Sequence, residues 1–238
     1  MSHVVLVTGS TSGIGRATAL RFAGRGDTVV FNSARSVDEG ERLAAATPGS
    51  FYVRGSIADD AEDIVSQVLE RAGRLDVLVN NAGTTRVIPH RDLAAASIEV
   101  WREIFEVNVF GTWAVSVAAM EALRASRGAI VNVSSLAGVR ATGSSIPYAA
   151  SKAALNHLTM LLAKVVGPEV RVNAVAPGLV DTPWTADWDT VRGFVTATAP
   201  LRRSGSANDV AQVVLDLADA EYVTGQVLVV DGGLGLVT

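Results

Sequence analysis

The residues best suited to acid–base chemistry are Tyr148 and Lys152, four positions apart in the segment Pro147-Tyr148-Ala-Ala-Ser-Lys152. Proline is favoured in the first turn of a helix and the alanines favour its continuation, so the two side chains are expected on one helical face, one turn apart. A phenol exchanges protons poorly at neutral pH because its pKa is about 10, whereas a neighbouring ammonium favours the phenolate. We therefore expect Lys152 to lower the pKa of Tyr148, so that the hydroxyl acts as an acid or a base. Alternatively, Tyr148 is an ordinary amphipathic-helix residue and Lys152 a solvated charge.

Other polar residues lie where they could join this pair. Ser134 and Ser135 follow an apolar stretch, 129–133, that reads as a strand. Asn108 lies in the middle of a segment, 97–125, that could form one long helix, where asparagine has no propensity advantage. Its amide therefore either faces water or serves a site.

A glycine-rich turn, Thr8 to Gly15, follows the continuous apolar run Val4 to Val7 and precedes a helical pattern over 16–23. Such a strand, turn and helix can hold a pyrophosphate on backbone N–H groups, because glycines permit close approach. A plain tight turn is the alternative interpretation. The turn is not a P-loop, because no Gly-Lys-Ser/Thr follows.

The stretch Asn32-Ser33-Ala34-Arg35-Ser36 follows the second expected strand, 28–31. A carboxylate there would bind the ribose 2′-hydroxyl of NAD, whereas an arginine accommodates the 2′-phosphate of NADP. The first carboxylate comes only at Asp38, so NADP(H) is favoured and NAD(H) remains possible. Arg35 could also be a solvated turn residue.

Strands and helices alternate along the whole chain, which predicts an α/β fold. We expect a single-domain, Rossmann-type, doubly wound parallel sheet of about seven strands with helices on both faces, spanning residues 1–238. The remaining expected helices cover 38–46, 60–72 and 206–218, and the remaining strands 51–53, 75–79, 170–175 and 226–230. Periodicity fades over 183–200, where Trp184 and Trp188 occur, so a mobile substrate lid is predicted at about 183–205.

Composition and charge limit the kinds of partner that the protein is expected to bind. The formal charge is −4, the arginines are scattered, and there are no cysteines and three separated histidines. Nucleic acid, a metal site and a membrane are therefore not expected as partners. The apolar run near the start of the sequence is too short for a signal peptide, so a cytoplasmic protein is expected.

Taken together, these motifs resemble the short-chain dehydrogenase/reductase family, in its compact single-domain, oxoacyl-reductase-like branch. The motifs are Thr8-Gly9-x-x-x-Gly13-Ile14-Gly15, Asn80-Asn81-Ala82-Gly83, Asn108, Ser135, Tyr148-x-x-x-Lys152 and Pro177-Gly178. Two late segments, 200–203 and 222–226, add to the resemblance, which covers essentially the whole chain.

The resemblance implies four catalytic residues. Tyr148 would be the acid that protonates a carbonyl oxygen, or the base in the reverse direction. Lys152 would lower its pKa and bind the nicotinamide ribose, Ser135 would bind the substrate oxygen, and Asn108 would hold a water that links Lys152 to solvent. Ser134 would serve structure.

The resemblance also implies a cofactor site, with the pyrophosphate on the glycine-rich turn, the adenosine near Asn81 and the nicotinamide near Pro177. Besides Tyr148 and Lys152, the expected cofactor residues are Thr8, Gly9, Ser10, Ser12, Gly13, Ile14, Gly15, Ser33, Arg35, Ser36, Ser56, Ile57, Asn81, Ala82, Gly83, Pro177, Gly178, Val180 and Thr182.

Two departures from the family pattern bear on function. Ser56-Ile57 replaces a frequent Asp-Val that contacts adenine, and Gly167-Pro168-Glu169 stands where reductases of acyl carrier protein often have a basic residue. We expect an NADP(H)-dependent oxidoreductase that interconverts a carbonyl and a secondary alcohol on a small or medium organic substrate. A 3-oxoacyl thioester reductase and a catalytically silent cofactor-binding regulator are the alternatives. The family is usually dimeric or tetrameric, so a homo-oligomer that pairs the helices near Ser97 and Pro147 is also expected.

Overall fold

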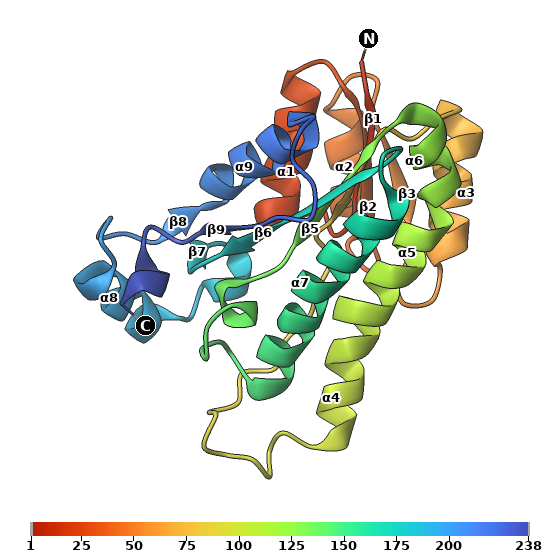
Figure 1. The fold of residues 1–238 in the computed structure, drawn as a ribbon. Helices are drawn as coiled ribbons and strands as arrows, with labels where there is room; N and C mark the ends of the chain where they lie inside the picture. Colours follow the sequence, from red (N-terminus) through yellow and green to blue (C-terminus); the bar gives the residue numbers. More distant parts are fainter. Residues whose placement is uncertain (1, 238) are drawn as a thin grey trace.

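A seven-stranded parallel sheet forms the centre of the computed structural model, which describes residues 2–237 (Figure 1). The strand order is β3-β2-β1-β4-β5-β6-β9. The strands are β1 (Val4–Val7), β2 (Thr28–Ser33), β3 (Phe51–Arg54), β4 (Val77–Asn80), β5 (Ala129–Val133), β6 (Arg171–Pro177) and β9 (Val227–Val230). The order runs outwards in both directions from β1 and β4, which confirms the predicted doubly wound fold.

Helices cover both faces of the sheet. One apolar cluster joins it to α1 (Gly13–Gly24), α2 (Val37–Ala45) and α9 (Ala207–Asp219). A second joins it to α3 (Ala61–Ala72), α5 (Thr112–Ala118), α6 (Met120–Ser126) and α7 (Ile146–Val166). Helix α9 begins where the helix over 206–218 was expected and is capped there, since the Ser206 hydroxyl accepts a hydrogen bond from the Asp209 N–H.

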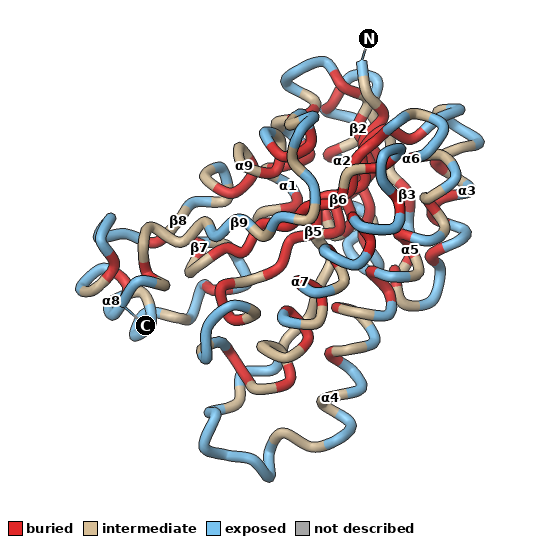
Figure 2. The backbone as a smooth tube through the Cα atoms, in the orientation of Figure 1, coloured by how far each residue is buried: buried red, intermediate tan, exposed pale blue. Residues whose placement is uncertain are grey.

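The central strands are buried along their whole length, as their continuous apolar runs predict (Figure 2). In β1, Val4 and Leu6 join one cluster while Val5 and Val7 join the other. Successive side chains of a strand point to opposite faces, so a strand covered on both sides must be apolar at every position. The sheet is therefore a rigid platform, and its strand ends position the polar residues that follow them.

The segment 97–125 is helical over almost its whole length, as expected, but it is not one regular α-helix. The segment contains α4 (Ile98–Phe105), a π-helical turn (Glu106–Gly111), α5 and α6 in succession. Asn108 lies in the π-helical turn, which widens the helix by one residue and is a feature often found at functional sites. The π-helical turn therefore coincides with Asn108, the residue that helix propensity did not explain.

The lid segment contains more regular structure than predicted. A 3-10 turn (Pro183–Thr185) and helix α8 (Asp189–Thr198) lie within 183–205, and a short second sheet pairs β7 (Val180–Asp181) with β8 (Gly205–Ser206). Threonine and glycine weaken the helical signal of α8, and Val195 is its one buried residue. Tertiary contacts thus supply an order that the local pattern does not show.

Within residues 2–237, none of the helices combines the length and the hydropathy needed to span a membrane. No three His, Asp or Glu side chains of the same residues are grouped as ligands for a metal ion.

Candidate active site

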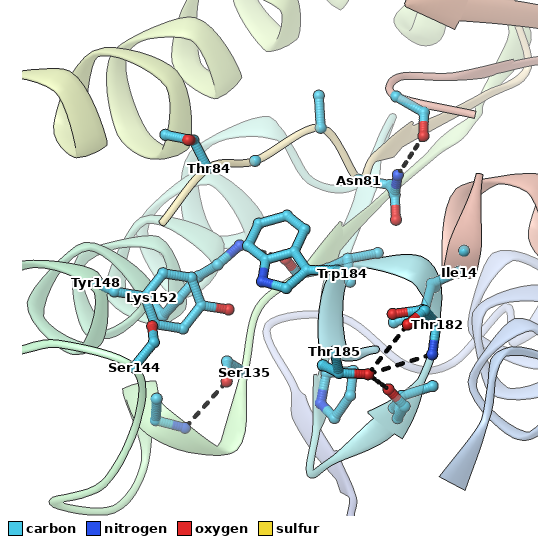
Figure 3. A pocket seen from close by; sticks show the side chains of 18 of the residues that line it. Ile14, Asn81, Thr84, Ser135, Ser144, Tyr148, Lys152, Thr182, Trp184 and Thr185 are labelled. Atoms are coloured by element: carbon cyan, nitrogen blue, oxygen red, sulfur yellow. Dashed lines mark hydrogen bonds between the residues drawn. The ribbon is translucent and has the colours of Figure 1, made fainter. Parts of the chain in front are cut away.

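The main cleft lies at the carboxyl ends of the parallel strands, where the strand order reverses between β1 and β4. Its volume is about 990 Å³, at the upper end of the range for ligand pockets. The glycine-rich turn, the ends of β4, β5 and β6, the start of α7 and the lid segment all contribute to its lining (Figure 3). Open α/β sheets bind their ligands at such a switch point.

Helix α7 carries Tyr148 and Lys152 into this cleft, as predicted. Its first turn is fixed by the hydroxyl of Ser145, which accepts a hydrogen bond of 3.3 Å from the Tyr148 N–H. Lys152 is 5% exposed, and its ammonium donates a hydrogen bond of 2.9 Å to the carbonyl of Val133 at the end of β5. The interpretation of Lys152 as a solvated charge is therefore wrong.

The expected lowering of the Tyr148 pKa is not found. Tyr148 is half-buried, and the protein around its hydroxyl raises the pKa by desolvation, while hydrogen bonding with the Ser135 side chain lowers it in part. The Lys152 ammonium lies 5.8 Å from the centre of the Tyr148 ring and is held by Val133, so desolvation of the phenol outweighs its effect on this pKa. Burial also lowers the pKa of Lys152, to about 8. Tyr148 is thus a neutral phenol near neutral pH, the form that donates a proton.

The two serines after β5 separate into different roles. The Ser134 hydroxyl donates to the main-chain carbonyl of Lys152 at 3.2 Å, so it ties β5 to α7, as predicted. Ser135 lines the cleft on the side of Tyr148 (Figure 3), and its hydroxyl accepts from the Ala137 N–H at 3.1 Å. That bond orients the Ser135 oxygen beside the phenol.

Asn108 does not face water, since it is 1% exposed. Its amide oxygen accepts from the Thr84 N–H at 2.8 Å, and its amide nitrogen donates to the Thr84 carbonyl and the Ser151 hydroxyl, each at 3.0 Å. A methyl group on Gly83 would come within 3.2 Å of the same amide oxygen and 3.7 Å of the Lys152 ammonium. Asn108 therefore lies beneath the cleft lining, close to Lys152, and fixes the loop after β4. Its predicted water remains a prediction.

Three glycines of the glycine-rich turn disfavour a side chain, Gly9 and Gly13 through their backbone conformation and Gly15 through close packing. Gly9 and Gly13 have positive φ angles of 62° and 53°. A methyl group on Gly15 would come within 2.3 Å of the Asn81 amide and 2.5 Å of the Gly9 carbonyl. Helix α1 begins at Gly13 with no acidic residue in its first turn, so its free N–H groups suit an anionic diphosphate.

Predicted residues of the turn divide into lining and support. Gly9, Ser12, Gly13 and Ile14 line the cleft. Thr8, Ser10 and Gly15 lie beneath it. The Thr8 hydroxyl accepts from the N–H groups of Asn81 and Ala82 at 3.0 Å, and the Asn81 amide donates back to the Thr8 and Gly9 carbonyls at 2.9 and 3.0 Å.

The end of the cleft beside β2 carries a positive charge. Arg35 is exposed, lines the cleft and forms no ion pair with any carboxylate of residues 2–237. Glu103 and Asp187, the only carboxylates among the described lining residues, belong to α4 and the lid segment. The other predicted residues that line this end and the loop after β4 are Ser33, Ser36, Ser56, Ile57, Asn81, Ala82 and Gly83.

The end of the cleft beside β6 contains all four residues predicted there, Pro177, Gly178, Val180 and Thr182. A methyl group on Gly178 would come within 2.8 Å of the Asp231 side chain. Thr182 faces Gly13 across the cleft, since a methyl group on Gly13 would lie 3.4 Å from the Thr182 side chain. The glycine-rich turn and the segment after β6 therefore approach each other closely at this end of the cleft.

Sequence reasoning missed one residue at the end of β2, Asn32, and one group of residues in the cleft wall. Asn32 was considered only for its lack of charge, yet its buried amide nitrogen donates to the carbonyls of Val53 and Gly55 at 3.1 Å and so fixes the end of β2. The group in the cleft wall consists of residues 87–90 and 142–144. No periodic pattern marks those loops. The serine before Ile146-Pro147 did carry a helix-cap signal that could have identified Ser145.

This fold and this set of residues define a nucleotide-dependent oxidoreductase of the Rossmann class. A family model described as "Enoyl-(Acyl carrier protein) reductase" matches residues 9–235. The chain belongs to the short-chain dehydrogenase/reductase family, in its oxoacyl-reductase-like branch. It is an NAD(P)-dependent enzyme acting on CH–OH and C=O groups.

Similar proteins extend over almost the whole chain. "Granaticin polyketide synthase putative ketoacyl reductase 2" of Streptomyces violaceoruber is 57% identical, covering 98% of this chain and 96% of the relative. "3-oxoacyl-[acyl-carrier-protein] reductase FabG" of Thermotoga maritima is 40% identical and covers 97% of each chain. The crystal structure of a "putative short-chain dehydrogenase/reductase" from Burkholderia xenovorans superposes with a TM-score of 0.92, at 38% identity, over 99% of this chain and 98% of that one.

Proposed function

We propose that this protein is an NADP(H)-dependent ketoreductase in which Tyr148 exchanges the proton. The observation that carries the proposal is the convergence of Ser135, Tyr148 and Lys152 on one wall of the cleft, with Asn108 directly beneath. The experiment that tests this proposal measures NADPH oxidation, as a loss of NADPH absorbance, in the presence of ketones. A preparation that binds NADPH but reduces no ketone would contradict the proposal.

Each side chain has a defined task in reduction. When bound, the cofactor supplies a hydride to the carbonyl carbon. Ser135 donates a hydrogen bond that holds the carbonyl oxygen beside the phenol, and the neutral Tyr148 hydroxyl gives that oxygen its proton. The charge that then develops on the tyrosine oxygen is stabilised by the nearby ammonium of Lys152. The product is a secondary alcohol, and the steps reverse for oxidation.

The unpaired guanidinium of Arg35 supports NADP(H) over NAD(H). An arginine pairs with a phosphate through charged hydrogen bonds, whereas a ribose hydroxyl gains little from it. We expect Arg35→Ala to raise the Kd for NADPH about 10- to 100-fold and to leave the Kd for NADH within about twofold. Fluorescence titration with both nucleotides measures this.

Arg124→Ala is the matched control for that titration. Arg124 is an exposed arginine of α6 that neither lines the cleft nor forms an ion pair within residues 2–237. Equal losses of NADPH affinity in the two variants, or equal losses of NADPH and NADH affinity in Arg35→Ala, would contradict the assignment.

A second candidate function is reduction of a 3-oxoacyl thioester. The names of the Streptomyces and Thermotoga relatives support it. The turn Gly167-Pro168-Glu169 offers no basic residue for such a substrate, and Glu169 belongs to a separate polar cleft together with residues 25–27, 218, 219 and 221. Assays with S-acetoacetyl-N-acetylcysteamine and acetoacetyl-CoA beside simple ketones separate the two candidates.

We also propose that two copies pair through the π-helical turn after α4, through α5 and through α7. Phe110, Trp113 and Val117 are 46–55% exposed and follow helical spacing, and Leu161 and Val165 of α7 are 51% and 69% exposed. Large apolar side chains grouped in this way usually mark an interface. We expect sedimentation velocity to show a dimer or tetramer, and Trp113→Glu to shift the population toward the 24.7 kDa chain. A wild-type protein that sediments only as a monomer at micromolar concentration would refute this.

A further inference from the structure

The part of the cleft beyond Tyr148 has two walls of different construction. The first consists of residues 87–90 and 142–144, from two loops that are hydrogen-bonded to each other. The hydroxyls of Thr85 and Ser144 lie 2.5 Å apart, and the Ile88 N–H donates to the Ser144 carbonyl at 2.8 Å. His90 adds a bond of 3.1 Å to the Gly143 carbonyl. These contacts make the first wall continuous.

The second wall carries the tryptophans of the lid segment. Trp184 and Trp188 both line the cleft, and the Trp184 indole points into it on the side of Tyr148 (Figure 3). The 3-10 turn that carries Trp184 is anchored, because the Thr185 hydroxyl donates to the Val180 carbonyl at 2.7 Å and Arg192 donates to the Thr185 carbonyl at 3.0 Å. Trp184 is nevertheless 46% exposed, so a large aromatic face is held open to the cleft.

The charges of this region disfavour an anionic substrate. Arg35 and Lys152 are the only arginine and lysine among the described lining residues, and both belong to the cofactor and catalytic parts of the cleft. The substrate side has Glu103, which is paired with Arg86 at 3.0 Å, and Asp187, which forms no ion pair within residues 2–237. The lining there is otherwise mainly apolar and includes Val87 and Val191.

We infer that the preferred substrate is an uncharged, flat, ring-fused ketone that stacks on Trp184, and that Trp184 is the residue selecting it. This inference rests on the proposed ketoreductase function. Aromatic rings gain from offset or edge-to-face contacts with an indole beyond the gain from burial alone, and a flexible acyl chain does not. A flat ring also loses less conformational freedom than an extended chain when the cleft orders it.

The test compares ketones of equal carbon number. We expect kcat/KM with NADPH to be at least about tenfold higher for 2-tetralone than for 2-decanone. Trp184→Leu should lower kcat/KM for 2-tetralone about three- to tenfold, mainly through KM, and change that for 2-decanone less than about twofold. Trp184→Phe, which keeps an aromatic face, should retain most of the preference.

Phe194→Leu is the control for aromatic loss from the same segment. Phe194 lies on α8, is 50% exposed and does not line the cleft, so its kinetics should match the wild type. Unchanged NADPH affinity and melting temperature in all variants show that the fold and the cofactor site are intact. Equal effects of Trp184→Leu on both ketones would overturn the inference.

A wild-type preference for 2-decanone, or for acetoacetyl-CoA over the neutral S-acetoacetyl-N-acetylcysteamine, would also overturn the substrate assignment while leaving the ketoreductase function standing. Failure to reduce any of these carbonyl compounds would instead contradict the proposed function itself.

Discussion

Tyr148→Phe will lower kcat for ketone reduction about 10²- to 10⁴-fold, because it removes the hydroxyl that gives the carbonyl oxygen its proton. The ring remains, so the packing of the first turn of α7 and the hydrogen bond from the Tyr148 N–H to Ser145 are preserved. The Kd for NADPH should change less than a few-fold. Stopped-flow measurement of NADPH oxidation under saturating ketone measures the loss directly.

Tyr222→Phe is the control for this substitution. It makes the same chemical change at a fully exposed tyrosine between α9 and β9, which does not line the cleft. Its kcat should equal that of the wild type. Turnover in Tyr148→Phe within tenfold of the wild type would remove Tyr148 from the mechanism.

Lys152→Met will lower kcat about 10²- to 10³-fold, because it removes the charge that stabilises the developing tyrosinate. Lys164→Met is the matched control, since Lys164 is the only other lysine of the chain and is exposed. Melting curves distinguish lost catalysis from lost folding. Activity in Lys152→Met close to that of Lys164→Met would show that the ammonium has no catalytic role.

The dependence of ketone reduction on pH separates the catalytic role of Lys152 from a structural role. The pKa of Lys152 is about 8, so the ammonium is lost as pH rises through that value, and ketone reduction should fall up to tenfold per pH unit above it. Residual activity of Lys152→Met should lack this limb. The folded pKa lies below the ordinary value of 10.5, so between these values the unfolded chain binds more protons and this group makes stability rise with pH. Lys152→Met should also remove this contribution to the dependence of stability on pH.

Local signals were enough to predict most of the fold. Apolar runs identified the strands because each central strand is covered on both faces, and Tyr148 and Lys152 were placed on one face because the helix repeat fixes that relation. The π-helical turn around Asn108 was missed, and the hydrogen bonds of Asn108 to Thr84 and Ser151 of other segments are not visible in a local pattern. Helix α8 was missed because its sequence is a weak helix former.

The features of the candidate site also fall into those that short sequence motifs predict and those that depend on contacts between distant segments. The glycine turn and the strand-end motifs are short continuous segments, and the structure brings them to one cleft. The pKa of Tyr148 depends on burial by distant segments, so a rule based on one neighbour gave the wrong direction. The first wall joins two distant loops, since Thr85 contacts Ser144, 59 positions later, and no sequence periodicity encodes that contact.

The hydrogen bonds between Thr8 and Asn81 limit how this protein could be divided or rebuilt. They join segments 73 positions apart, and the Gly9 carbonyl also depends on the Asn81 amide. A fragment that ends before β4 would carry the whole glycine motif yet lack the side chain that holds it in shape. Grafting the motif into another scaffold would therefore require Asn81, which directly follows β4, to be transferred with it.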